Sequence, residues 1–195
     1  MLEAEVKFAL DEPRAASLRA ALIRLGATLH GSKAQADLYF AHPMRDFAQT
    51  DEALRLRRSG DRVWLTWKGP KLDPTLKIRE EIELDFGQDF DAARTLLERL
   101  SFMQVREVRK LRETWSLPAP ASAEIVIDEV TDLGLFCEVE VLASTAAEGR
   151  SRLEVLLVTL DLGDLAPVVK SYLELLLSAA GSSAAPNSRA RTPLG

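Results

Sequence analysis

Charged and apolar residues alternate along several short segments of this chain, each of which we interpret as a β-strand with one charged and one apolar face. The charged faces carry both signs. Their acids are Glu3, Glu5, Glu81, Glu83, Asp128, Glu138 and Glu140, and their bases are Lys7, Arg55, Arg57, Lys68, Arg79, Lys110 and Arg112. So many arginines and glutamates per strand are unusual for a surface, and we therefore expect the charged faces to line an interior.

Size and composition favour a single soluble domain. The chain has 195 residues, of which 47% are hydrophobic and 28% charged. Its net charge of −5 argues against a nucleic-acid-binding surface. No apolar run reaches the length of a membrane span, and the N-terminal segment carries acids rather than the pattern of a signal peptide. The single cysteine, Cys137, excludes an internal disulfide and fits a cytoplasmic protein.

Strands and helices follow one another along most of the chain. We expect strands near residues 2–10, 34–41, 52–58, 62–69, 76–86, 105–116, 124–130 and 135–142. Helical periodicity predicts helices over about 13–25, 90–100, 146–160 and 167–177, with Leu96, Leu97 and Leu100 on the buried side of the second. Residues 1–178 form the expected domain, and 179–195, rich in Ser, Ala and Pro, form an expected disordered tail.

Short connections determine how the strands are arranged. The turns at 59–61 and 131–134 join neighbouring strands and make them antiparallel. The predicted fold class is therefore α+β, an eight-stranded antiparallel β-barrel or tunnel with a charged lumen and helices packed outside. Apolar residues such as Ile78, Ile82 and Leu84 lie opposite the charged face of their strand, and the amphipathic helices are expected to cover them.

The acids of the charged faces have the chemistry of a metal site. Glu3 and Glu5 lie on one strand face, close enough to share a divalent cation, and hard carboxylate oxygens suit Mg²⁺ or Mn²⁺. Asp128, Glu138 and Glu140 lie across an expected hairpin, so that three further carboxylates can converge. A bound cation, or facing bases, would relieve their mutual repulsion.

The bases have the chemistry of a phosphate site. Arg55 and Arg57 share one strand face, and Lys110 and Arg112 repeat the same spacing later in the chain. Guanidinium groups bind phosphate oxygens in pairs and stay charged at any physiological pH. The pattern predicts an enclosed site for a small polyphosphate, with Lys7 close to the acids.

Each motif taken alone also fits a structural role. Glu3-x-Glu5-x-Lys7 fits a solvated edge strand, and each basic pair fits a cross-strand salt bridge. His30 and His42 have no partner at metal-ligand spacing and are expected at the surface or in loops. Tyr172 is expected to be an ordinary buried or half-buried helix residue.

The segment Glu3-x-Glu5-x-Lys7 at the N-terminus resembles the signature of the CYTH superfamily, also called triphosphate tunnel metalloenzymes. Further segments between residues 1 and 178 resemble the class IV adenylate cyclases and their close relatives. These segments are 37–40, 45–47, 50–57, 68–71, 79–83, 128–130, 138–140 and 171–176.

This resemblance implies a β tunnel that binds a small-molecule triphosphate together with Mg²⁺ or Mn²⁺. By the family's roles, the metal would be bound or oriented by Glu3, Glu5, Asp128, Glu138 and Glu140. The phosphates would be held by Lys7, Arg55, Arg57, Lys68, Arg79, Lys110 and Arg112. Glu81 and Glu83 would support the tunnel, and the catalytic residues would be Glu5, Lys7, Arg57 and Lys68.

Three functions remain open at this point. A class IV adenylate cyclase-like enzyme would convert ATP to cyclic AMP and pyrophosphate. A triphosphatase would hydrolyse inorganic triphosphate, thiamine triphosphate or a nucleoside triphosphate. A binding module would hold polyphosphate or nucleotide without turnover. We expect no nucleic-acid or membrane partner, and the oligomeric state is open, a homodimer included.

Overall fold

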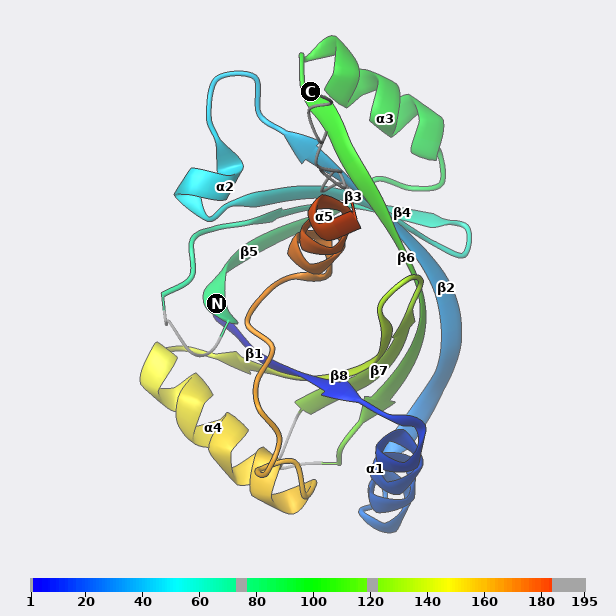
Figure 1. The fold of residues 1–195 in the computed structure, drawn as a ribbon, viewed down its shortest axis with the longest axis vertical. Helices are drawn as coiled ribbons and strands as arrows, with labels where there is room; N and C mark the ends of the chain where they lie inside the picture. The colour runs from blue at the N-terminus through cyan, green and yellow to red at the C-terminus, as the bar shows by residue number, and fades with distance from the viewer. Residues whose placement is uncertain (1, 73–76, 119–122, 184–195) are drawn as a thin grey trace, which may run out of the picture.

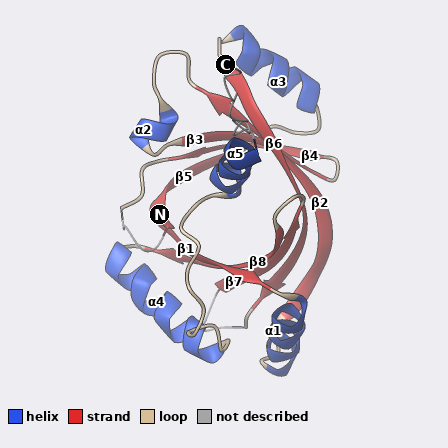
Figure 2. Ribbon diagram, viewed as in Figure 1, coloured by secondary structure: helices blue, strands red, loops and turns tan. Residues whose placement is uncertain are grey.

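Eight antiparallel strands close into a barrel in the computed structural model, which describes residues 2–72, 77–118 and 123–183 (Figures 1 and 2). The strands are β1 (Leu2–Leu10), β2 (Thr28–Ala41), β3 (Ala53–Ser59), β4 (Arg62–Lys68), β5 (Lys77–Asp85), β6 (Met103–Ser116), β7 (Ala123–Val130) and β8 (Gly134–Ala143). Around the barrel they follow the order β1-β5-β4-β3-β2-β6-β7-β8. The predicted α+β barrel is confirmed.

The helices of the described residues surround the barrel wall, except the last of them, which lies across the opening of the barrel (Figure 2). They are α1 (Glu12–Arg24), α2 (Phe47–Thr50), α3 (Phe90–Arg99), α4 (Ala146–Thr159) and α5 (Tyr172–Ser183). None of them combines the length and the apolar character needed to cross a membrane. The short α2 was not predicted, and β2 and β6 begin at Thr28 and Met103, earlier than expected.

The largest apolar cluster lies outside the barrel, because alternate residues of each strand point away from the lumen. On β1, Ala4, Val6 and Phe8 are at most 2% exposed. They pack in one cluster with Leu22 of α1 and Leu153 of α4. The residues between them on β1 are charged and point inward. The barrel therefore keeps its apolar core between the strands and the helices and leaves its lumen for charged side chains.

Helix α3 covers a second part of the barrel through fewer leucines than predicted. Ala93 and Leu97, which lie one turn apart, are buried in a cluster that includes Leu56 of β3. Leu96 and Leu100, which we expected beside Leu97, are 48% and 57% exposed. The contact face of α3 is therefore one narrow stripe.

The apolar face of β5 is only partly covered by other elements. Ile78 is fully buried, as expected, but Ile82 and Leu84 on the same face are 48% and 54% exposed. The expectation that helices cover the whole apolar face is therefore wrong for the second half of β5. The hairpin turns at 59–61 and 131–134 are confirmed by the pairs Ser59–Arg62 and Val130–Gly134.

Helix α5 begins five residues later than predicted. Ser171 and Glu174 form a reciprocal cap, in which the backbone N–H of Ser171 donates to Glu174 (2.6 Å) and the N–H of Glu174 donates to the Ser171 hydroxyl (3.2 Å). The preceding segment is not helical, because Val168 donates its N–H to the carbonyl of Lys7 on β1 (2.7 Å). Residues 179–183, which we assigned to the tail, continue α5, and residues 184–195 lie outside the described residues.

Gly149 allows α4 to approach β1 closely, which generates a prediction about stability. A Cβ at this position would lie 2.7 Å from the Cβ of Ala4 and 3.4 Å from that of Ala143. Alanine improves helix propensity by about 1 kcal/mol, but overpacking a core usually costs about 1–3 kcal/mol. Because both facing groups are short methyls that cannot swing aside, we expect Gly149→Ala to lower the free energy of unfolding, measured by urea denaturation.

Ser151→Ala is the matched control, because Ser151 lies on the exposed side of α4. This change adds helix propensity without a new contact and should leave stability unchanged or slightly higher. A Gly149→Ala variant as stable as the wild type would show that the close approach has no energetic weight.

Candidate functional site

A cavity of about 1120 Å³ occupies the lumen of the barrel. It is lined by thirteen of the residues singled out from the sequence: Glu3, Glu5, Lys7, Arg55, Arg57, Lys68, Arg79, Glu81, Glu83, Lys110, Arg112, Glu138 and Glu140. Asp128, the remaining one, is fully buried and pairs with Arg112. The barrel therefore brings together every side chain for which the sequence predicted a common site.

Strand register places an acid directly opposite a base at several points of the lining. The cross-strand neighbours are Glu3–Arg79, Lys7–Glu138, Asp37–Arg57, Lys68–Glu81 and Arg112–Asp128. Directly opposed residues on one face of an antiparallel pair are close enough to interact, and opposite charges there stabilise the sheet. The pairing register itself therefore compensates most of the buried charge.

Glu140 departs from this rule. It lies opposite Glu5 on β1 and opposite Glu124 on β7, so like charges face one another on both sides. Carboxylate oxygens of Glu5, Glu138 and Glu140 all lie within 4.8 Å of one another. Burial and the nearby Glu3 and Glu5 raise the pKa of Glu140 well above its usual range. Three converging carboxylates of this kind are a donor set that suits a divalent cation.

Asp128 is held by three donors. Arg112 forms a bidentate pair with it (Nε 2.8 Å, Nη2 2.6 Å), and the same Nη2 lies 2.6 Å from Glu138. The Lys110 ammonium donates to Asp128 at 3.2 Å. Burial alone would raise the pKa of Asp128, but Lys110 and Arg112 outweigh it and hold that pKa below its usual range. Asp128 thus orients bases, and it lies outside the Glu5, Glu138 and Glu140 group.

Tyr172, at the start of α5, is the third donor to Asp128. Its hydroxyl lies 3.0 Å from Asp128 Oδ2, and its ring centre lies 4.1 Å from the Lys7 Nζ and 5.2 Å from the Lys110 Nζ. The side chain is buried, as expected, but sequence periodicity gave no sign that it reaches the charged lining.

Asp37 on β2 was missed as a lining residue, although its segment was part of the family resemblance. It is 1% exposed and forms a bidentate pair with Arg57 (2.7 and 2.8 Å). Arg55 and Lys110 lie 3.5 and 4.0 Å from the same carboxylate. Burial opposes ionisation, but Arg57 and Arg55 hold the pKa of Asp37 well below its usual range. The strand carries no second charge at i, i+2, so alternation alone could not reveal this residue.

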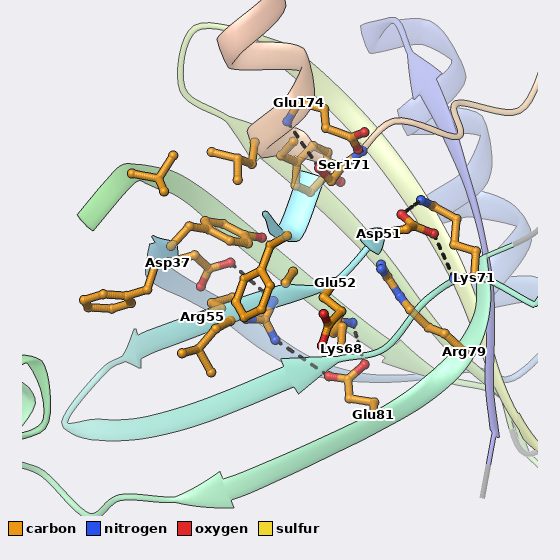
Figure 3. Close-up of a pocket in the computed structure, with 18 of the residues that line it drawn as sticks. Asp37, Asp51, Glu52, Arg55, Lys68, Lys71, Arg79, Glu81, Ser171 and Glu174 are labelled. Atoms are coloured by element: carbon orange, nitrogen blue, oxygen red, sulfur yellow. Dashed lines mark hydrogen bonds and ion pairs between the residues drawn. The ribbon is translucent and has the colours of Figure 1, made fainter. Parts of the chain in front are cut away.

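Lys68 contacts two acids, Glu3 and Glu81, of which Glu81 is labelled beside it in Figure 3. Its Nζ lies 2.5 Å from Glu81 and 3.3 Å from Glu3. Burial raises the pKa of Glu3 to about 7, with Lys68 opposing this rise and Glu81 and Glu5 adding to it. Glu3 therefore belongs to the Lys68 cluster rather than to the Glu5, Glu138 and Glu140 group.

The remaining predicted residues lie beside this cluster. The Arg55 Nη2 lies 3.9 Å from Glu81 and 3.8 Å from Glu83 and donates to the Thr66 hydroxyl (3.2 Å). Arg79 also lines the cavity, near the ion pair of Lys71 and Asp51 (Figure 3). Of the two histidines, His30 lies exposed on β2 and His42 in the following loop, as expected.

Comparisons with known proteins agree on one family. The CYTH domain model matches residues 1–175. A protein of Methanocaldococcus jannaschii that carries the provisional name adenylate cyclase is 36% identical over 178 residues, which are 90% of this chain and 98% of that protein.

Solved structures show the same fold. The PH1819 protein of Pyrococcus horikoshii OT3 is 35% identical, with a TM-score of 0.80 over 91% of this chain and 99% of its own. A Hippeastrum protein, provisionally named an adenylyl cyclase and described as having a dominant triphosphatase activity, is 18% identical, with a TM-score of 0.67 over 91% of this chain and 96% of its own. At that identity the likeness supports the fold alone.

The buried pairing of Asp37 predicts a large, pH-dependent loss of stability in Asp37→Asn. Removing this buried carboxylate leaves the buried Arg55 and the half-buried Arg57 without their main counter-charge, and breaking a buried ion pair typically costs about 3–5 kcal/mol. Because the pKa of Asp37 is lowered in the folded state, its contribution is complete above the unfolded-state pKa of about 3.9 and is lost as the pH falls below it. In chemical denaturation, the free energies of unfolding of variant and wild type should therefore differ less at pH 3 than at pH 7.

Asp164→Asn is the control, because Asp164 pairs with Arg14 at the surface and its side chain is 65% exposed. Such pairs contribute about 0–1 kcal/mol. The role assigned to Asp37 would be contradicted if both substitutions lowered the free energy of unfolding equally. It would also be contradicted if the loss of stability in Asp37→Asn were larger at pH 3 than at pH 7.

Proposed function

The chain belongs to the CYTH domain family, and on that basis we propose that it is a divalent-metal-dependent enzyme acting on a triphosphate inside the barrel. One observation carries the proposal. In a lining where register sets acids against bases, Glu5 and Glu140 face each other and converge with Glu138. Arginines and lysines surround this acid group in the same cavity.

The acid group fits a hard divalent cation such as Mg²⁺ or Mn²⁺. Its donors are carboxylate oxygens, two of its three residues are buried, and Glu5 and Glu140 lie directly opposite each other on neighbouring strands. Glu5, Glu138 and Glu140 would hold the ion, while Glu3 and Asp128 would act indirectly through Lys68 and Arg112. A bound cation would supply Lewis-acid polarisation of a phosphoryl oxygen.

The bases would bind and orient the phosphates. Arg112 divides its Nη2 between Asp128 and Glu138, so charge compensation at Glu138 would release this nitrogen to a phosphate oxygen. Lys7 lies 4.0 Å from the same carboxylate and would gain in the same way. Arg55, Arg57, Lys68, Arg79 and Lys110 would complete the phosphate-binding set, since each lines the cavity.

Cyclisation of ATP to cyclic AMP and pyrophosphate is the first candidate reaction. The name of the 36% identical M. jannaschii protein supports it. Apolar side chains, among them Met44, Phe47, Leu142 and Leu177, line the same cavity and offer a nonpolar surface to an organic group, which inorganic triphosphate does not need. In this reaction the ribose 3′-oxygen attacks the α-phosphate, and Arg57 and Lys68 would stabilise the departing pyrophosphate.

Hydrolysis is the second candidate. The Hippeastrum protein of the same fold is described as having a dominant triphosphatase activity. The residues would have the same tasks, because phosphoryl transfer to water also depends on positioning and on charge stabilisation. Its substrates would be inorganic triphosphate, thiamine triphosphate or a nucleoside triphosphate.

A product assay distinguishes the candidates. Purified protein is incubated with Mg²⁺ or Mn²⁺ and with ATP, tripolyphosphate or thiamine triphosphate, and products are separated by chromatography. We expect cyclic AMP and pyrophosphate from ATP, and orthophosphate would instead support hydrolysis. Binding without either product would indicate a binding module, and absence of both binding and turnover would refute the proposal.

The metal site generates a separate prediction. Glu5→Gln removes one charge from the acid group at constant size and should lower turnover by roughly a hundredfold, because metal catalysis contributes several kcal/mol to transition-state stabilisation. Calorimetric Mn²⁺ titration should show weaker binding in the same variant. Glu129→Gln, at an exposed position on β7, is the control and should change neither quantity. If Glu5→Gln bound Mn²⁺ as tightly as the wild type, Glu5 would not be a metal ligand.

A further inference from the structure

The ring of Tyr172 faces two of the proposed phosphate-binding lysines. We infer that Tyr172 is a positioning residue, which holds Lys7 and Lys110 ready for phosphate oxygens. This inference rests on the function proposed above and adds a residue that neither charge patterning nor strand register identifies. Tyr172 comes from α5, whereas the charged lining residues predicted from the sequence all lie on strands.

Contacts of α5 with its surroundings hold Tyr172 in place. In Figure 1, α5 lies across the opening of the barrel, and the segment before it crosses from α4. The cap formed by Ser171 and Glu174 sets the first turn of the helix. The Tyr172 ring packs edge-on against Phe136, with ring centres 5.1 Å apart. Helix capping and aromatic packing together leave the ring little freedom to move away from the lysines.

The ring gives Lys7 and Lys110 an aromatic partner in addition to their carboxylate neighbours. Arg57 and Arg112 form bidentate pairs with carboxylates, which a phosphate has to replace. The Lys7 Nζ lies 4.1 Å from the centre of the neutral Tyr172 ring. An aromatic face attracts an ammonium group without neutralising its charge, so the lysine keeps its attraction for an incoming anion.

Loss of the ring would change which groups the lysines contact. Lys7 Nζ already lies 4.0 Å from Glu138, and Lys110 Nζ lies 3.2 Å from Asp128. Without the aromatic face, the Lys7 ammonium would move closer to Glu138, and Asp128 would be the nearest remaining partner of Lys110. A triphosphate would then compete with carboxylates alone for both ammonium groups, and its affinity would fall.

Two substitutions separate the ring from the hydroxyl. Tyr172→Phe keeps the aromatic face and loses the hydrogen bond to Asp128, whereas Tyr172→Leu loses both. We measure tripolyphosphate binding by calorimetry, and KM and kcat for the substrate found in the product assay. In Tyr172→Leu, the dissociation constant and KM should rise about tenfold with kcat nearly unchanged, because the ring acts on binding. Tyr172→Phe should stay within about threefold of the wild type.

Leu176→Ala is the matched control for damage to α5. Leu176 lies one turn further along the helix, in the same buried apolar cluster as Tyr172. We expect this variant to lose thermal stability, as Tyr172→Leu does, while its KM and tripolyphosphate affinity remain those of the wild type. The comparison of the two variants distinguishes a loss of affinity caused by displaced lysines from one caused by weaker packing of α5 on the barrel.

Three results would overturn the inference. They are wild-type affinity in Tyr172→Leu, an equal loss of affinity in Tyr172→Phe, and an equal loss in Leu176→Ala at matched stability. Each of them leaves the proposed function intact as long as the wild type binds tripolyphosphate. A wild-type protein that neither binds nor turns over any triphosphate would overturn both.

Discussion

Compensation of buried charge is the constraint on which the rest of this structure depends. A carboxylate or guanidinium taken out of water costs several kcal/mol unless a partner of opposite charge is fixed beside it. The barrel meets this requirement through register, which sets Asp37 against Arg57 and Arg112 against Asp128. A shift of one strand by one residue would turn its charged side chains outward and leave their partners buried alone. Charge pairing therefore specifies the strand alignment as well as the lining.

The same constraint makes the exception informative. Glu140 lies between two glutamates of neighbouring strands, and the carboxylates of Glu5 and Glu138 converge on it. Asp37, Asp128 and Glu81, by contrast, each lie within hydrogen-bonding distance of an arginine or lysine. Three converging carboxylates have the electrostatic character expected for cation binding, and the neighbouring bases supply the complementary character for an anion.

Most of the fold and much of the site could be predicted from alternation alone. Charged residues at positions i and i+2 identify the side chains that share one face of a strand. A set of such strands joined by short turns predicts a closed antiparallel sheet. Alternation does not state which strands are neighbours, so it could not place Glu3 with Lys68 or Asp128 with Arg112. It also misses single lining residues: Asp37 has no charged residue two positions away on its own strand, and Tyr172 belongs to a helix. Leu96 and Leu100 were misplaced because a helical stripe predicts a face but not its width.

The separation of core and lining along each strand has a consequence for how such a barrel evolves. On β1, Ala4, Val6 and Phe8 belong to the apolar cluster, while the intervening residues belong to the cavity. Ligand preference can therefore drift at one set of positions while the other set continues to maintain the scaffold. Such changes are constrained, however, because replacing an acid of the lining leaves the base on the adjacent strand without its counter-charge. Viable changes of specificity should therefore accumulate as coupled double replacements across neighbouring strands.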